Sequence, residues 1–190
     1  MFPVFLLSRY YLERKSVLVA GTAILGAVVA VLELSRFLRI PFPLLPFLKF
    51  DIIGIPMVIG YLSLGLLSGT ATCFVSFAII SFRDPFSGFM KCLAELSTII
   101  GAYVILRGKP MNTSLKSKIF AVCSSIISRV VIMAVANVLL FPIFRGLTAQ
   151  AVIALLPFTC PFNAIQGTIS IVGGLIVHEA IVQRLPSLRT

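Results

Sequence analysis

Three carboxamide side chains are the residues of this chain best suited to bind a small molecule. Asn137 lies toward the C-terminal end of an apolar segment, and Asn163 and Gln166 open the next one in PFNAIQG. The i, i+3 spacing of Asn163 and Gln166 places both on one face of a helix. A carboxamide both donates and accepts hydrogen bonds, which suits a neutral heterocycle with amide and imide edges. Hydrogen bonding between helices is an equally good interpretation.

Two ionisable side chains lie near the middle of apolar segments. Glu95 lies within 86–107 and Arg129 within 116–144. Because an unpaired charge inside a membrane is costly, we expect these two residues to form an ion pair. The pair would fix the register of two helices, or one of its members would face a ligand.

Catalytic and metal-binding patterns are missing from the sequence. His178 is followed by Glu179 without a second histidine at zinc-site spacing, and the four cysteines form no CxxC pair. There is also no phosphate-binding glycine loop, so this chain does not power transport with ATP by itself. We therefore expect a protein that is not an enzyme and that holds no metal or cofactor.

The composition requires lipid around most of the chain. Of the 190 residues, 59% are hydrophobic and 12% are charged, whereas a soluble domain averages about 25% charged residues. The net charge of +10 does not indicate nucleic acid, because the basic residues lie at the ends of apolar segments rather than in one patch. The sequence thus predicts one integral membrane domain over residues 1–190.

Six apolar segments predict an all-α bundle of six transmembrane helices. The predicted ranges are 16–38, 53–67, 69–82, 86–107, 116–144 and 162–184. The residues before the first range, which include a short apolar run, are expected to form an interfacial segment rather than a signal peptide.

The distribution of basic residues predicts that both termini are cytoplasmic. With six crossings, nine Lys and Arg residues would share the side of the termini and six would lie on the other. The six on the outer side are Arg36, Arg39, Lys49, Arg83, Lys91 and Arg145.

A proline-rich loop, RIPFPLLPFLKFD at 39–51, joins the first two predicted helices on the outer face. Its prolines stop a helix, yet most of its other residues are apolar. Irregular apolar backbone at membrane depth must pack on protein or line a cavity. The loop is therefore either a stabilising contact or a lid over an outward-facing pocket.

Small residues four apart occur on the first predicted helix. Ala23 and Ala27 form an A-x-x-x-A pattern, which lets another helix approach closely. By itself the pattern is frequent in apolar helices.

Four stretches together resemble one family, the substrate-binding S components of energy-coupling factor (ECF) vitamin transporters, and most of all its riboflavin-specific branch. FLKFDIIGIP at 47–56 resembles F-L-K-x-D-x-x-D-I-P, and ANVLLFPIF at 136–144 resembles a segment with the same Asn and Pro. PFNAIQG at 161–167 resembles P-F-N-x-x-K-G, and AELSTIIGAYV at 94–104 resembles a helix that begins G-E. The resemblance spans essentially the whole chain.

The resemblance implies a protein of the cell membrane that binds a vitamin from outside and passes it to a transmembrane coupling subunit with two ATPase subunits. The proline-rich loop would be the lid, and Ala23 with Ala27 would contact the coupling subunit. The residues expected at the substrate are Leu48, Lys49, Phe50, Asp51, Glu95, Asn137, Asn163 and Gln166.

Three positions depart from the riboflavin pattern: Gly54 replaces an acid, Thr98 an asparagine and Gln166 a lysine. Riboflavin or a related flavin is the leading ligand, and another vitamin or vitamin precursor is the alternative. A membrane enzyme acting on a lipid-like substrate and a purely structural membrane protein are the other classes left open. Saturable ligand binding would indicate the transporter subunit, and turnover of a lipid would indicate the enzyme. Tolerance of alanine at all three carboxamides would indicate the structural protein.

Overall fold

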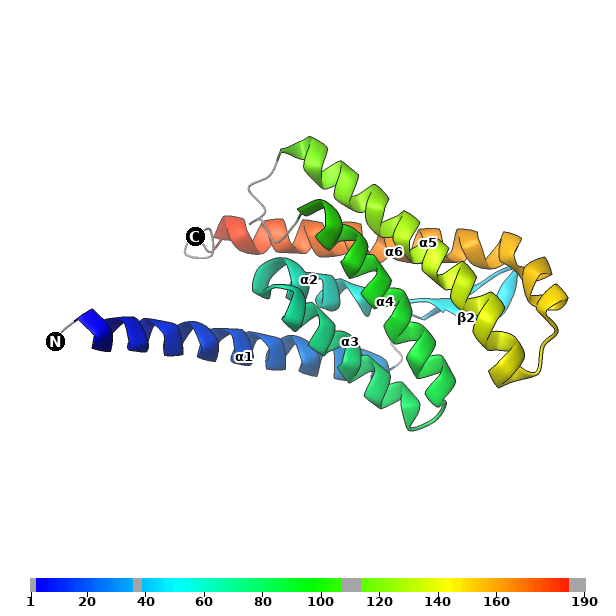
Figure 1. Cartoon of the computed structure of the whole chain (residues 1–190), viewed down its shortest axis with the longest axis horizontal. Coiled ribbons are helices and arrows are strands. Elements are labelled where there is room, and N and C mark those ends of the chain that lie inside the picture. The colour runs from blue at the N-terminus through cyan, green and yellow to red at the C-terminus, as the bar shows by residue number, and fades with distance from the viewer. Residues whose placement is uncertain (1–2, 36–38, 107–113, 185–190) are drawn as a thin grey trace.

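The computed structural model describes residues 3–35, 39–106 and 114–184, and for residues 3–14 only the backbone. Within these residues the chain forms six helices and one β-hairpin (Figure 1). The elements are α1 (Pro3–Ser35), β1 (Ile40–Phe42), β2 (Leu45–Phe50), α2 (Gly54–Leu64), α3 (Leu66–Ser81), α4 (Pro85–Leu106), α5 (Leu115–Arg145) and α6 (Ala149–Arg184). The predicted helical membrane fold is confirmed, and several boundaries differ.

Two helices begin earlier than the sequence predicts. The first runs from Pro3, so the expected interfacial segment is the first part of α1; the predicted end at 36–38 lies outside the described residues. The last begins at Ala149 rather than 162, with Pro157 and Pro161 inside it. Neighbouring helices can satisfy the backbone groups that proline frees in a membrane, so these prolines do not mark the start of α6.

The second and third helices are too short to cross a bilayer individually. With 11 and 16 residues, α2 and α3 reach about 16 and 24 Å, below the roughly 30 Å of a hydrocarbon core. Four of the described helices, α1, α4, α5 and α6, are long and apolar enough to span. The chain turns between α2 and α3 at Gly65, whose φ of 99° is unfavourable for residues with a Cβ.

The proline-rich loop contains regular structure that an all-α prediction did not include. β1 and β2 pair antiparallel, with Ile40 opposite Phe50 and Pro41 opposite Lys49. The register shifts between Pro41 and Phe42, as expected where proline cannot donate to the ladder. The loop is thus a defined hairpin.

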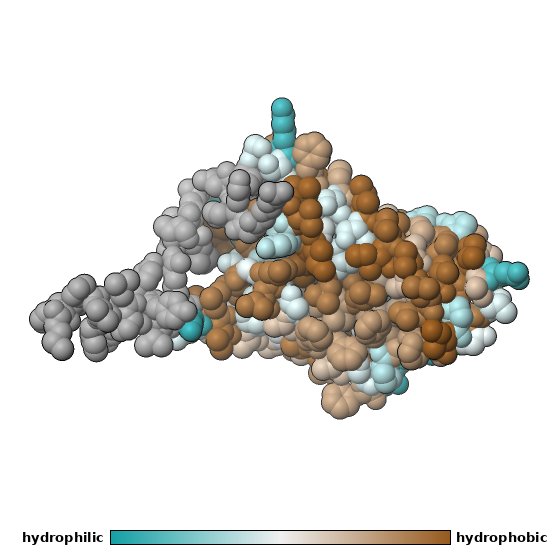
Figure 2. All heavy atoms as spheres, in the orientation of Figure 1, coloured by the Kyte–Doolittle hydropathy of each residue, from teal (hydrophilic) through white to brown (hydrophobic). Residues whose placement is uncertain are grey.

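The core lies where α2, α4 and α6 meet, and apolar side chains also cover the outside. Ile53, Met57, Ile99 and Ile171 are almost fully buried. Figure 2 shows apolar residues over much of one face of the molecule, and the exposed large hydrophobic residues occur on every one of the four long helices. An apolar exterior of this extent fits a surface in contact with lipid.

Candidate ligand-binding site

A cavity of about 630 Å³ lies between the β-hairpin and the helices α4, α5 and α6. Its lining also includes Glu33 near the end of α1 and Ile80 near the end of α3. Ligand sites for small molecules commonly have volumes of about 300–1,000 Å³. The cavity is therefore large enough for a vitamin-sized molecule.

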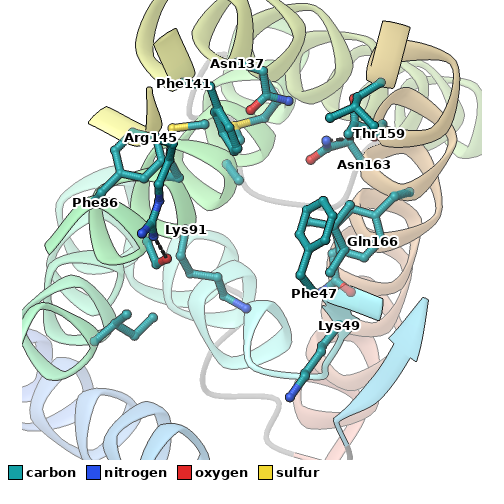
Figure 3. A pocket seen from close by; sticks show the side chains of 18 of the residues that line it. Phe47, Lys49, Phe86, Lys91, Asn137, Phe141, Arg145, Thr159, Asn163 and Gln166 are labelled. Atoms are coloured by element: carbon teal, nitrogen blue, oxygen red, sulfur yellow. Dashed lines mark hydrogen bonds between the residues drawn. The ribbon is translucent and has the colours of Figure 1, made fainter. Parts of the chain in front are cut away.

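Two of the three predicted carboxamides face the cavity with hydrogen-bonding capacity left over. Figure 3 shows Asn137 on α5 and Asn163 on α6 directed toward the open space, with Thr159 beside Asn163. Nδ2 of Asn163 donates to the carbonyl oxygen of Thr159 at 2.9 Å. Its oxygen, and the whole amide of Asn137, form no hydrogen bond within the described part of the chain. These groups are available to a ligand.

The third carboxamide, Gln166, holds the end of the hairpin. Its Nε2 donates to the carbonyl oxygen of Asp51 at 2.8 Å, and its Oε1 accepts the Asp51 backbone N–H at 3.2 Å. Gln166 lines the cavity and is 2% exposed. Its amide is thus paired with backbone as a strand partner would be, and the hairpin is fixed to α6.

The carboxylate of Asp51 is bound on two sides. It accepts the backbone N–H of Ile53 at 3.1 Å and pairs with the ammonium of Lys91 on α4. Burial by itself raises the pKa of Asp51, but Lys91 and the Ile53 amide outweigh it and leave that pKa below its ordinary value. Asp51 is therefore a charged anchor between the hairpin and α4.

The predicted ion pair of Glu95 and Arg129 is confirmed. Oε1 of Glu95 lies 3.0 Å from Nη1 of Arg129, and the two side chains are 1% and 3% exposed. Arg129 also donates to Oγ1 of Thr98 at 3.1 Å. Arg129 lines the cavity and Glu95 lies behind it, so the acid does not meet the open space.

No side chain fits at Gly54, where the riboflavin pattern has an acid. A Cβ at this position would lie 2.7 Å from Cβ of Ser170 and 2.5 Å from Oε2 of Glu95, with Oγ of Ser170 closer still. Glycine is needed here because α2 passes directly over this buried polar group. An acid at position 54 would also bring a second negative charge onto Glu95.

Aromatic rings attach the hairpin to α6. Phe50 stacks on Phe162 with centroids 4.9 Å apart, and Phe42 lies 5.6 Å from each of them. Phe50 packs in this cluster and does not itself line the cavity, whereas Phe47, three residues earlier on β2, does (Figure 3). Ring packing holds β2 against α6, and the hydrogen bonds of Gln166 hold Asp51, the residue that follows β2.

Six of the eight residues expected at the substrate line the cavity, and two do not. The six are Leu48, Lys49, Asp51, Asn137, Asn163 and Gln166; Phe50 and Glu95 lie behind the lining. The sequence analysis missed several lining residues: Glu33, Phe86, Lys91, Phe141, Arg145 and Thr159. The polar residues among them lie near the ends of apolar segments. Residues that face lipid headgroups lie there as well, so this position alone does not identify a cavity-lining residue.

Comparison with known proteins finds similarity among solved structures. No family model matches the sequence, and no curated protein does. A solved structure of the S component of a bacterial ECF transporter superposes with a TM-score of 0.77 at 22% identity, covering 90% of this chain and 98% of that one. The chain has the S-component fold. The matched protein is a transporter component.

On this S-component fold, Ala23 and Ala27 occupy the exposed side of α1. A second small-residue pair on α1, Gly26 and Ala30, differs, because Gly26 is buried and a Cβ built there would lie 3.5 Å from Cγ2 of Val75 on α3. The A-x-x-x-A pattern is thus open to an approaching helix.

Proposed function

We propose that this chain is the substrate-binding subunit of an ECF-type transporter. The observation that carries the proposal is the cavity of about 630 Å³ under a hairpin clamped by Gln166, in a chain with the S-component fold. A chain without an ATP-binding loop needs a separate motor. The proposed partners are a transmembrane coupling subunit and two ATPase subunits.

The ligand we propose is a vitamin or vitamin precursor, with riboflavin or a related flavin as the first candidate. Asn137 and Asn163 support a flavin, because the whole amide of Asn137 and the side-chain oxygen of Asn163 are unpaired and suit the amide and imide edges of such a ring. The ring faces would meet Phe47 and other apolar lining residues. Gly54 and Gln166 leave another vitamin as the second candidate.

The proposed orientation has both termini in the cytoplasm, so that the hairpin faces outside. This orientation rests on the excess of Lys and Arg on the side of the termini. The ligand would enter from outside through the hairpin end and leave after the coupling subunit engages α1.

Flavin absorption and fluorescence of the purified chain, followed by riboflavin titration, test this proposal. We expect fluorescence quenching that saturates at one ligand per chain and is lost in Asn137→Ala/Asn163→Ala. Thr168→Ala is the matched control, because its exposed hydroxyl bonds only to its own helix. Absence of flavin binding, with another vitamin raising Tm, would keep the class and change the ligand. The proposal would be rejected if no vitamin bound saturably.

A further inference from the structure

Basic side chains gather around the cavity in excess over acidic ones. Among the residues that line it, only Glu33 and Asp51 are acidic. The basic lining residues are Arg39, Lys49, Arg83, Lys91, Arg129 and Arg145. A neutral ligand does not require such an excess.

Four of these cations already have a carboxylate. Arg129 pairs with Glu95, and Lys91 pairs with Asp51. Arg39 pairs with Glu33, and Arg145 pairs with Asp84. These four pairs are electrically balanced, so they leave no net charge for a ligand.

Lys49 and Arg83 are different. Neither has a carboxylate within 4 Å among the described residues, and both are exposed while lining the cavity. They come from separate elements, β2 and the turn between α3 and α4. In the view of Figure 3, the Lys49 side chain extends toward the end opposite Asn137. Lys49 thus lies away from the Asn137 end of the cavity in this view.

The position of these cations in the chain is itself unusual. The six basic residues that the sequence assigns to the outer side include Arg36, which lies outside the described residues. The other five all line the cavity. Basic residues are normally sparse on that side of a membrane protein. Three of the five pair with acids, so Lys49 and Arg83 are the two that no carboxylate balances among the described residues.

We propose that the ligand carries a negatively charged group, a carboxylate or a phosphate, which Lys49 and Arg83 bind. This proposal rests on the proposed function and narrows its ligand class, favouring among the flavins a phosphorylated one over neutral riboflavin. Charges of one sign lining a cavity with apolar walls concentrate counter-ions there. The guanidinium of Arg83 can hold a carboxylate or phosphate by two parallel hydrogen bonds, and Lys49 adds a point charge. The apolar or ring-shaped body of the ligand lies toward Asn137 and Asn163.

Matched pairs of vitamins, each pair differing in one anionic group, test the proposal by thermal shift and titration calorimetry. The probes are flavin mononucleotide with riboflavin, nicotinate with nicotinamide, and pyridoxal 5′-phosphate with pyridoxal. Biotin with its amide completes the set. We expect the anionic member of at least one pair to raise Tm and to bind at least about tenfold more tightly than its neutral partner, as for a hydrogen-bonded charge.

The variant Lys49→Gln/Arg83→Gln should remove that preference and keep the fold. Its matched control is Lys116→Gln/Arg184→Gln, which removes the same charge from exposed positions that do not line the cavity. Equal or tighter binding of the neutral members, or an anion preference that survives in Lys49→Gln/Arg83→Gln, would overturn the proposal. Binding of no probe by the wild-type chain would overturn both this proposal and the proposed function.

Anionic lipid is the other source of the same chemistry. Nanodiscs of phosphatidylcholine with and without phosphatidylglycerol distinguish it. We expect the soluble anion to bind with similar affinity in both. Loss of that binding when phosphatidylglycerol is present would assign Lys49 and Arg83 to lipid headgroups and overturn the proposal.

Discussion

The amide of Gln166 on α6 and the backbone of Asp51, 115 positions earlier, are joined by two hydrogen bonds of 2.8 and 3.2 Å. The contact is buried and lies where β2 leads into α2. It fixes one end of the hairpin that borders the cavity. A change at Gln166 is therefore expected to alter how the hairpin closes, although its amide has little capacity left for a ligand.

Replacing Gln166 by alanine should loosen the hairpin. Two buried backbone groups of Asp51 would lose their partner, which costs about 1–3 kcal/mol for each group left unsatisfied. We expect a lower Tm, faster proteolysis within 39–51 and a faster ligand dissociation rate. Thr168→Ala, an exposed position on the same helix, is the control.

The variant Gln166→Lys tests how much of this effect comes from the two hydrogen bonds between Gln166 and the Asp51 backbone. Lysine can donate to the Asp51 carbonyl but cannot accept its N–H, so about half of the loss is expected. A dissociation rate in Gln166→Ala that matches the wild type would show that the clamp does not control closure.

The ion pair of Glu95 and Arg129 predicts strong destabilisation when one member is removed. Glu95→Gln leaves Arg129 buried without its counter-charge, at a cost of about 3–5 kcal/mol. Ligand affinity in the fraction that remains folded should change little, because Glu95 does not line the cavity. Glu95→Gln/Arg129→Met should recover most of the stability. Denaturant titration and ligand titration measure the two quantities.

The half-exposed pair of Lys118 and Glu179 is the matched comparison for that cycle. Glu179→Gln should cost only about 0–1 kcal/mol. A stability loss in Glu95→Gln no greater than that of Glu179→Gln would contradict the structural role. A loss of ligand affinity without loss of stability would instead assign Glu95 to binding.

Gly54 should not accept a side chain. Gly54→Ala places a methyl group against Ser170 and the Glu95 carboxylate, and overpacking of this kind costs about 1–3 kcal/mol or more. Restoring the acid of the riboflavin pattern with Gly54→Asp should be worse, because it adds like charge beside Glu95. The compensating double variant Gly54→Ala/Ser170→Gly should regain part of the lost Tm. Wild-type Tm in Gly54→Asp would contradict the packing.

The helices, the cavity-facing asparagines and the buried ion pair could be predicted because membrane constraints act locally on sequence. A charge such as Glu95 needs a counter-charge at similar depth, and Arg129 is the basic residue placed near the middle of another predicted helix. The early start of α6 could not be predicted from the sequence, because a proline such as Pro157 normally indicates a helix end. Here neighbouring helices allow Pro157 to lie inside α6.

The role of Gln166 and the placement of Lys49 and Arg83 at one cavity both depend on the fold. A carboxamide has the same appearance in a sequence whether it meets a ligand or a backbone N–H and C=O. Lys49 and Arg83 lie 34 positions apart (83 − 49) in different elements. Their meeting at one cavity follows from the path of the hairpin, which the proline-rich sequence did not specify.

The exposed face of α1 gives the last prediction, which concerns assembly rather than binding. Ala23 and Ala27 are exposed on a helix with little cover from the rest of the chain, so larger side chains there disturb no internal packing. Ala23→Leu/Ala27→Leu should therefore keep wild-type Tm and ligand affinity. If a coupling helix packs closely at these residues, the same variant should fail to co-purify with the coupling subunit and the ATPases and should lose ATP-dependent uptake in proteoliposomes. Ala154→Leu, an exposed alanine on α6, controls for a general effect of bulk, and it should assemble and transport normally. Normal assembly of Ala23→Leu/Ala27→Leu would move the docking face elsewhere on the molecule without affecting the ligand site.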